Sequence, residues 1–508
     1  NSDNMVSGDY NYNPRLTGIV TIPTSGGGWD WTGIRGINFF LANYTRTTEP
    51  REKVNPYIGE MYFWRAWYYY SKLKDFGDLP WYSKPLTTSS EELYSPRLSR
   101  ALIADSILRD LDSAALLLPS IERVAEGRLH RDAALLLQSR VALYEGTWEK
   151  YHEGTSFGVE NADPSRFFRK AAEAAKKVID GAMFDIQPAN SKPDEAYWAL
   201  FNQEDYSSFK DVMLWRKYDL SLNNYHYAQH TYVNSANTGI SKALVESYLC
   251  TDGKPISVSS LYAGDETMDD LMRNRDPRLS QTVFTKGKPR VVVNGDTTGR
   301  FIVPDLTLAN RLRNTTGYQL YKGLDPAASK IAGNVNGAII FRYAEVLVNY
   351  AEAMAELNLC TQEVLNLTIN KLRDRVGMPH LDISVGFVDL NWDFPNLSPL
   401  LNEIRRERRV ELACEGYRFD DLMRWAATDI IKRPVLGAKM KQFVAIRDQF
   451  QPTLNPDAIP VNSNGYIAPY QLTPAKDGRP FDPAKHFLAP LPINELTLNK
   501  NLKQNPGY

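Results

Sequence analysis

"NEIRRERRVELACEGYRFDDLMRW", residues 402–425, has the pattern of two helices joined at a glycine. Glu403, Glu407 and Glu411 recur every four residues, so they form one column on the first helix. Arginines occupy positions between them, and Arg406 lies three residues from Glu403. One interpretation of this run is a basic patch that binds an anionic partner. Alternating signs at this spacing favour the other interpretation, a helix whose charges pair with one another.

The same helical period extends upstream from this pair. It predicts a helix that begins at Gly33 and further helices over 52–76, 99–118, 129–148, 164–179, 337–358 and 363–377. In the helix at 337–358, Ile340 is expected to begin the apolar stripe. The helices follow one another in pairs of roughly 35–45 residues, and small alanine positions let neighbours approach closely, as in tetratricopeptide-type hairpins. The predicted fold class is therefore mostly α, a tetratricopeptide-like scaffold of helix pairs.

Between residues 181 and 336 the helical period is weak, and Tyr, Asn, Asp and Gly are frequent. Only short strand-like runs occur there, such as "RVVVNG" at 290–295. A segment of this length is too long for a connector, and long insertions in a rigid scaffold usually carry function. The predicted plan has an N-terminal loop and helical scaffold at 1–182, a loop-rich ligand-binding insertion with short strands at 183–336, continued helical scaffold at 337–427, and an irregular C-terminal segment packed on the scaffold at 428–508.

The composition limits the classes of partner. Among 508 residues, 59 Lys and Arg nearly balance 60 Asp and Glu, so no overall charge attracts nucleic acid or an anionic membrane. No apolar run approaches the roughly 18 residues that a membrane span needs. The aromatic content is the informative feature, with 28 Tyr, 20 Phe and 10 Trp. Tyrosine-rich surfaces are often recognition surfaces, because a rigid amphipathic ring gives contact area at low cost in entropy.

The motifs that would indicate chemistry are incomplete. Gly28 and Gly33 have the spacing of a phosphate-binding loop, but Ile34 follows where that motif requires lysine. The run "HYAQH" places His226 and His230 four residues apart, without the glutamate that a zinc protease motif carries after its first histidine. No nucleophile motif is found, and adjacent acids point in different directions on a helix. The sequence therefore predicts no catalytic, metal-binding or cofactor-binding residues, and no cofactor.

Two loop segments combine aromatic rings with amide or carboxylate groups, a mixture that suits the apolar C–H faces and hydroxyl rim of a sugar. The predicted carbohydrate-binding residues are Trp29, Asp30, Asn224, Tyr225, Tyr227 and Tyr232. Asp30 is also placed to cap the helix that follows. The alternative is that each ring fills its own loop. Trp64, Trp67 and Tyr68 lie within the long helix at 52–76 and are expected in the core.

Nearly the whole chain carries a series of motifs, which are, in order, "AWYYYSKLKDFGDLPW" (66–81), "YLCTDGKPI" (248–256), "NRDPRL" (274–279), "TGYQLYKG" (316–323), "FRYAEVLVNYAEAMAELN" (341–358), "INKLRDRVGMP" (369–379), "RRERRVELACEGYRFDDLMRW" (405–425) and "FLAPLPINELTLNKNLKQNPGY" (487–508). Together these motifs resemble the SusD/RagB family of nutrient-binding outer-membrane lipoproteins of the Bacteroidetes. These are scaffold motifs, so the resemblance does not identify ligand-binding residues.

The resemblance implies about four tetratricopeptide-like helix pairs that support a loop-rich face. It implies a surface-exposed lipoprotein of the outer membrane, anchored through a lipidated cysteine upstream of residue 1. The implied partners are an oligosaccharide ligand and a SusC-like TonB-dependent β-barrel transporter, and not nucleic acid. The expected function is glycan capture and delivery without catalysis. A glycan-degrading hydrolase and a helical-repeat scaffold that binds only proteins remain as alternatives.

Overall fold

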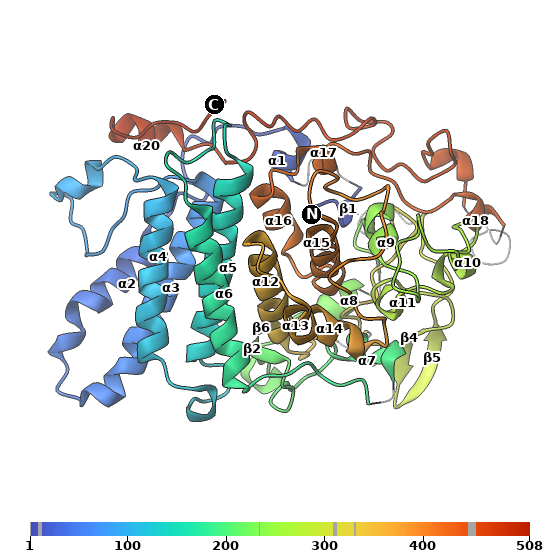
Figure 1. Ribbon diagram of the computed structural model, residues 1–508, viewed down its shortest axis with the longest axis horizontal. Helices are drawn as coiled ribbons and strands as arrows, with labels where there is room; N and C mark the ends of the chain where they lie inside the picture. The colour runs from blue at the N-terminus through green and yellow to red at the C-terminus, as the bar shows by residue number, and fades with distance from the viewer. Residues whose placement is uncertain are drawn as a thin grey trace.

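The computed structural model describes residues 2–8, 13–190, 192–232, 234–307, 312–329, 332–445 and 454–508. Figure 1 shows a mostly helical molecule in which long helices stand side by side in one half and loops with short helices and strands fill the other. The predicted mostly α fold class is confirmed. The long helices are α2 (Thr32–Asn43), α3 (Arg51–Phe76), α4 (Arg100–Leu117), α5 (Arg131–Tyr151), α6 (Pro164–Gly181), α12 (Tyr343–Glu356) and α15 (Pro399–Glu411).

Consecutive helices pack as hairpins, α3 against α4 and α5 against α6, and α12 then contacts both α6 and α15. Close packing of α5 on α6 depends on small side chains. A Cβ added at Gly146 would lie 2.8 Å from the ring of Phe168, so only glycine fits at this contact. Ala171 and Ala175 of α6 are buried on the same face. These residues explain why the Ala-rich pattern in the sequence produces a layered helical scaffold.

The scaffold helices expected between residues 337 and 377 differ from the prediction in two places. Residues Ala338–Arg342 form strand β6, and Ile340 is exposed in it, so Ile340 does not begin the stripe of α12. The predicted helix at 363–377 is divided into α13 (Gln362–Leu367) and α14 (Ile369–Arg375) by Thr368, whose φ of −125° and ψ of −89° are not helical. The last pair consists of α15 and α16 (Arg418–Arg424).

Three two-stranded antiparallel sheets are described outside the helical layer. They pair β1 (Met5–Ser7) with β3 (Thr238–Ile240), β2 (Val212–Arg216) with β6, and β4 (Pro289–Val293) with β5 (Asp296–Arg300). The short helices of the described chain include α1 (Pro14–Thr17), α7 (Pro193–Ala199), α8 (Ala228–Tyr232), α9 (Lys242–Ser247), α10 (Met268–Met272), α11 (Pro277–Thr282), α17 (Thr428–Ile431) and α18 (Lys441–Val444). The irregular C-terminal segment crosses the top of the molecule in Figure 1 and ends beyond α20 (Ile493–Leu498).

The N-terminal segment, residues 2–7, is bonded to parts of the chain that are distant in sequence. Its strand β1 pairs with β3, and the carboxylate of Asp3 forms ion pairs with Arg418 of α16 and Arg409 of α15 at 2.8 and 2.9 Å. Arg479 donates to the carbonyl oxygen of Ser2 at 2.8 Å. The segment is therefore part of the folded body.

Helix α15 carries a column of buried carboxylates. Glu403, Glu407 and Glu411 are all buried, and each forms ion pairs with arginines. The predicted pair of Glu403 with Arg406 is present at 3.1 Å. Most partners, however, come from other elements, as in the pair of Glu407 with Arg278 of α11. The charge pattern thus predicted ion pairing correctly but not its position in the interior.

In the described part of the chain, none of the helices is both long and apolar enough to cross a membrane.

Glu149 of α5 gives the scaffold a specific pH dependence. Burial, and then the neighbouring charge of Glu145, raise the pKa of Glu149 to about 7, although Arg166 and a hydrogen bond from the backbone N–H of Asp163 oppose this. A carboxyl whose pKa rises on folding stabilises the fold fully below its unfolded value of 4.5 and loses that contribution as pH rises through 7.

We expect Glu149→Gln to raise the melting temperature at pH 8 by about 1–3 °C, because the amide removes the buried charge. At pH 5 the variant and the parent should melt together, since both side chains are then neutral. Thermal denaturation from pH 5 to pH 8 measures the difference. Equal melting temperatures for the two proteins at pH 8 would contradict the assignment.

Candidate functional site

The clearest exposed aromatic feature of the insertion is the segment that follows β2, residues 217–227, here called the tyrosine loop. Asp219 and Asn224 exchange backbone hydrogen bonds of 2.7 and 3.0 Å, which close the loop at its base. The carboxylate of Asp219 accepts from the N–H and the hydroxyl of Ser221, and Asn223 adopts a left-handed φ of 52°. Side chains of this kind fix a turn locally. The rings are therefore presented on a fixed backbone.

Tyr225 and Tyr227 lie together on this loop. Their ring centroids are 5.6 Å apart and their planes are nearly perpendicular, at 86°. Tyr227 is 54% exposed, whereas Tyr225 is half-buried and lies over Gly333, where an added Cβ would approach its ring to 3.1 Å. A hydrogen bond with Tyr225 raises the pKa of Tyr227. The arrangement offers a sugar one open ring face and phenolic oxygens.

Asn224 borders the same loop. Its side-chain oxygen accepts from Arg216 at 3.2 Å, and its amide nitrogen donates to the carbonyl oxygen of Lys217 at 3.2 Å. Arg216 in turn lies over the ring of Tyr218, 5.0 Å from its centroid. The structure thus brings the predicted residues Asn224, Tyr225 and Tyr227 together in one exposed segment.

His226 has a structural role in this region. The ring of His226 accepts from the N–H of Ala228 and contacts the carbonyl oxygen of Asn336 at 2.9 Å, so its Nε2 must carry the proton. Its backbone exchanges hydrogen bonds with Asn334. Neither ring nitrogen is available to a metal. Within the described ranges there is no group of three or more His, Cys, Asp or Glu side chains placed to hold a metal ion.

The prediction that Trp29 is an open ring outside the core is wrong. Trp29 is only 7% exposed and packs edge-on against Phe76 and Trp31, with centroids 5.0 and 5.2 Å away. Positive φ angles at Gly26, Gly27 and Gly28 turn this loop back onto α3, and Lys72 holds the turn through the carbonyl oxygen of Gly28 at 2.9 Å. A glycine-rich sequence signals the turn but not the direction in which its tryptophan points.

Asp30 is exposed beside this buried ring. Its carboxylate accepts from the N–H and hydroxyl of Thr32, the first residue of α2, at 3.0 and 2.7 Å. Asp30 thus bonds to the first residue of α2 from the position before the N-cap, which Trp31 occupies without a side-chain cap hydrogen bond. These hydrogen bonds lower the pKa of Asp30. Tyr232 ends α8, but its side chain lies outside the described residues.

The outer face of α3 carries exposed rings that were expected in the core. Trp64 and Tyr68 are 38% and 44% exposed, and Tyr57 lies two turns before Trp64 on the same face. Only Trp67 packs inward, against Phe341 of β6. The sequence did contain a signal for this exposure, since Lys53, Glu60 and Ser71 fall on that same side of the helix.

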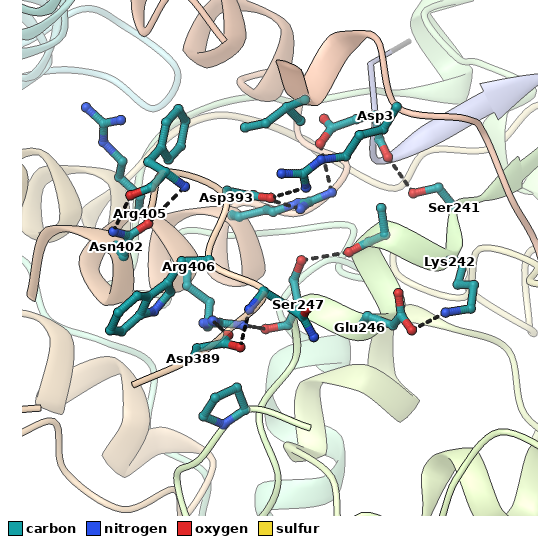
Figure 2. A pocket seen from close by; sticks show the side chains of 18 of the residues that line it. Asp3, Ser241, Lys242, Glu246, Ser247, Asp389, Asp393, Asn402, Arg405 and Arg406 are labelled. Atoms are coloured by element: carbon teal, nitrogen blue, oxygen red, sulfur yellow. Dashed lines mark hydrogen bonds and ion pairs between the residues drawn. The ribbon is translucent and has the colours of Figure 1, made fainter. Parts of the chain in front are cut away.

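A cavity of about 590 Å³ lies between α9, the loop at 389–394, α15 and residues 430–436. Figure 2 shows Asp3 and Asp393 in its upper part, Arg406 beside Asp389 below, and Lys242 paired with Glu246 at its right side. None of its lining residues belongs to the tyrosine loop. The cavity and the loop are therefore separate features of the molecule.

Comparison with known proteins explains the arrangement of scaffold and loops. A model of the SusD family matches residues 200–508, which is more than half of the chain. The chain belongs to the SusD family. A second family model, described as "starch-binding associating with outer membrane", matches residues 24–143 of this SusD-family protein. The family resemblance of the sequence motifs is thereby confirmed.

Among curated relatives, SusD-like protein P2 of Formosa agariphila is 27% identical over 479 residues, which cover 93% of this chain and 78% of that protein. A SusD-like carbohydrate-binding protein from Bacteroides fragilis has a similar structure, with a TM-score of 0.75 and 23% identity over 99% of this chain and 91% of that one. A laminarin-binding SusD-like protein has a TM-score of 0.60 and 18% sequence identity, and the match covers 100% of this chain and 92% of that one. A structure solved with a xylogluco-oligosaccharide has a TM-score of 0.63 and 17% sequence identity, and the match covers 98% of this chain and 91% of that one. At these identities the solved structures establish that this SusD-family protein shares their fold.

Proposed function

We propose that this SusD-family protein binds an oligosaccharide at the cell surface and delivers it intact to a TonB-dependent β-barrel transporter of the outer membrane. The proposal is supported by family membership and by similar proteins that bind laminarin or were solved with a xylogluco-oligosaccharide. The observation that carries it in this chain is the exposed tyrosine pair of a loop closed by its own hydrogen bonds.

The tyrosine loop can hold a sugar weakly and reversibly. The open ring of Tyr227 suits stacking on a pyranose face, and the hydroxyl of Tyr225 can bond to the sugar rim. One stacking contact contributes about 1 kcal/mol, so a few contacts of this kind give millimolar to high-micromolar affinity. Weak binding suits a protein that releases its cargo to a transporter.

We expect Tyr227→Ala to weaken glycan binding about fivefold, because one stacking contact is lost, with little change in stability. Affinity gels containing laminarin, xyloglucan or starch identify a ligand, and calorimetry with its oligosaccharide gives the Kd. Tyr94→Ala is a matched control, since Tyr94 is also 54% exposed but lies in the loop before α4. Equal affinities of the parent and the Tyr227 variant for a confirmed ligand would remove Tyr227 from the site.

Two other functions are separated by direct assays. A glycan hydrolase would release reducing ends from a polysaccharide panel during overnight incubation, and we expect none. A scaffold that binds only proteins would co-purify with the transporter and bind no glycan. Delivery requires both activities, so co-purification with a SusC-like barrel and glycan binding should be found in the same preparation.

Attachment to the membrane is proposed to occur through a lipidated cysteine upstream of residue 1. The description of the family model that matches residues 24–143 supports association with the outer membrane. Metabolic labelling of the full-length precursor with a fatty acid analogue tests this part of the proposal.

A further inference from the structure

The cavity shown in Figure 2 has an unusual balance of charge at one end. Four arginines gather there around two carboxylates. Arg418 contacts Asp3 at 2.8 Å and Asp393 at 3.3 Å, and Arg409 contacts the same two carboxylates at 2.9 and 3.2 Å. Arg433 reaches Asp393 at 2.6 Å. Arg409, Arg418 and Arg433 thus share two carboxylates, those of Asp3 and Asp393.

The fourth cation, Arg479, is buried and lines the same cavity. It donates to the carbonyl oxygen of Ser2, and within the described ranges it has no carboxylate at ion-pair distance. Burial and then the like charge of Arg418 lower the pKa of Arg409, whereas Asp3 and Asp393 raise the pKa of Arg418 against the effect of burial. This end of the cavity therefore places four arginines around two lining carboxylates, a balance that favours a further anion.

The opposite end of the cavity has the reverse character. Arg406 is flanked there by two carboxylates, Asp389 and Glu403, and Lys242 is paired with Glu246. Trp392 lies beside this end and donates to Glu403 at 2.8 Å. A ligand that matches both ends has an anionic group at one side and hydroxyl donors at the other.

We propose that this cavity binds an acidic sugar, one that carries a carboxylate or a sulfate ester, with the anionic group among Arg409, Arg418, Arg433 and Arg479. The guanidinium fork matches both groups through paired charge-assisted hydrogen bonds. The sugar hydroxyls would face Asp389. The volume of about 590 Å³ lies within the range of small-molecule sites. The inference rests on the proposed function only in taking the ligand to be a sugar, and it concerns a second site.

Calorimetry at constant ionic strength tests the cavity with four probes: glucuronate, glucose 6-sulfate, glucose and inorganic sulfate. We expect at least one acidic sugar to bind at least tenfold more tightly than both glucose and inorganic sulfate. Glucose that binds as well as the acidic sugars would overturn the role of the arginines. If inorganic sulfate binds as tightly as the acidic sugars, the inference that the cavity recognises a sugar would be overturned.

Variants place the binding in the cavity. Arg433→Ala should weaken binding of the acidic sugar about tenfold, the loss expected for one charge-assisted contact, and Arg479→Met should have a similar effect. The side chain of Arg433 is 45% exposed, so its removal should leave the fold intact. Arg131→Ala is the matched control, because that side chain is 46% exposed at the start of α5. Unchanged binding in both cavity variants would refute the site.

The two proposals fail separately. Loss of neutral-glycan binding in Tyr227→Ala, with no acidic sugar bound by the parent protein, would leave the proposed function intact and refute the cavity. Acidic-sugar binding that depends on Arg433 while all neutral glycans fail to bind would support the cavity and refute the tyrosine loop as a glycan site.

Discussion

Glu411→Ala is expected to lower the free energy of unfolding by about 3–5 kcal/mol, the usual cost of removing one partner from a buried ion pair. The Glu411 carboxylate is fully buried and contacts Arg342 and Arg375 at 2.7 Å and Arg278 at 3.0 Å. These arginines belong to β6, α14 and α11, so one carboxylate joins α15 to three other elements. Burial alone would raise the pKa of Glu411, but the three guanidinium groups lower it overall.

The Glu411→Ala variant leaves three buried arginines, and the carboxylates that remain near them do not pair with all three equally well. Arg342 keeps Glu415, and Arg278 keeps Asp276, whereas Arg375 keeps only Asp211 at 3.3 Å among its described ion pairs. Urea unfolding followed by tryptophan fluorescence measures the loss. Glu195→Ala, which removes an exposed pair with Lys192, should change stability by less than about 0.5 kcal/mol. A loss below about 1 kcal/mol for Glu411→Ala would show that the network is not structural.

Trp29→Ala should lower the free energy of unfolding by about 3 kcal/mol and leave glycan affinity unchanged in the folded protein. The ring lies in the main hydrophobic core, between Phe76 of α3 and Trp31 before α2, so its removal leaves a cavity there. Its neighbour Asp30 would remain exposed. The substitution is therefore expected to weaken the packing of the glycine-rich loop against α3 without changing an exposed binding surface.

Paired measurement of stability and binding separates Trp29 from Tyr227. Urea unfolding should show a large loss for Trp29→Ala and a change within about 0.5 kcal/mol for Tyr227→Ala. Calorimetry at a temperature where both variants are folded should show weaker glycan binding for Tyr227→Ala and unchanged binding for Trp29→Ala. A Trp29 variant with normal stability and weakened glycan binding would restore Trp29 as a ligand residue.

Long helices were predictable because their burial follows a regular period. The helix expected at 52–76 is observed as Arg51–Phe76, and the one at 164–179 as Pro164–Gly181. Periodicity does not predict the secondary structure of a short apolar run that can form either a helix or a strand. Ile340 continues the period of α12, yet it lies in β6, the strand that pairs with β2, because β-branched residues suit either state and a partner strand decides.

Exposure of individual rings was much less predictable. Tyr68 and Tyr69 are adjacent in one helix, but Tyr68 is exposed and Tyr69 is buried against Trp81. A composition rich in aromatics predicts that recognition surfaces exist, not which rings form them. The tyrosine loop was located from its mixture of rings and amides. The arginine-lined cavity was not, because its charges come from segments that only the fold brings together.

The bonding of residues 2–7 has a mechanical consequence. Tension applied at this end of the chain passes through the double ion pair of Asp3 into α15 and α16, and through β1 into β3. The tyrosine loop leaves the body from β2, which pairs with β6 and not with either of those strands. A pull on the first residues would therefore load α15, α16 and β3, whereas the base of the tyrosine loop is held in the separate β2–β6 sheet.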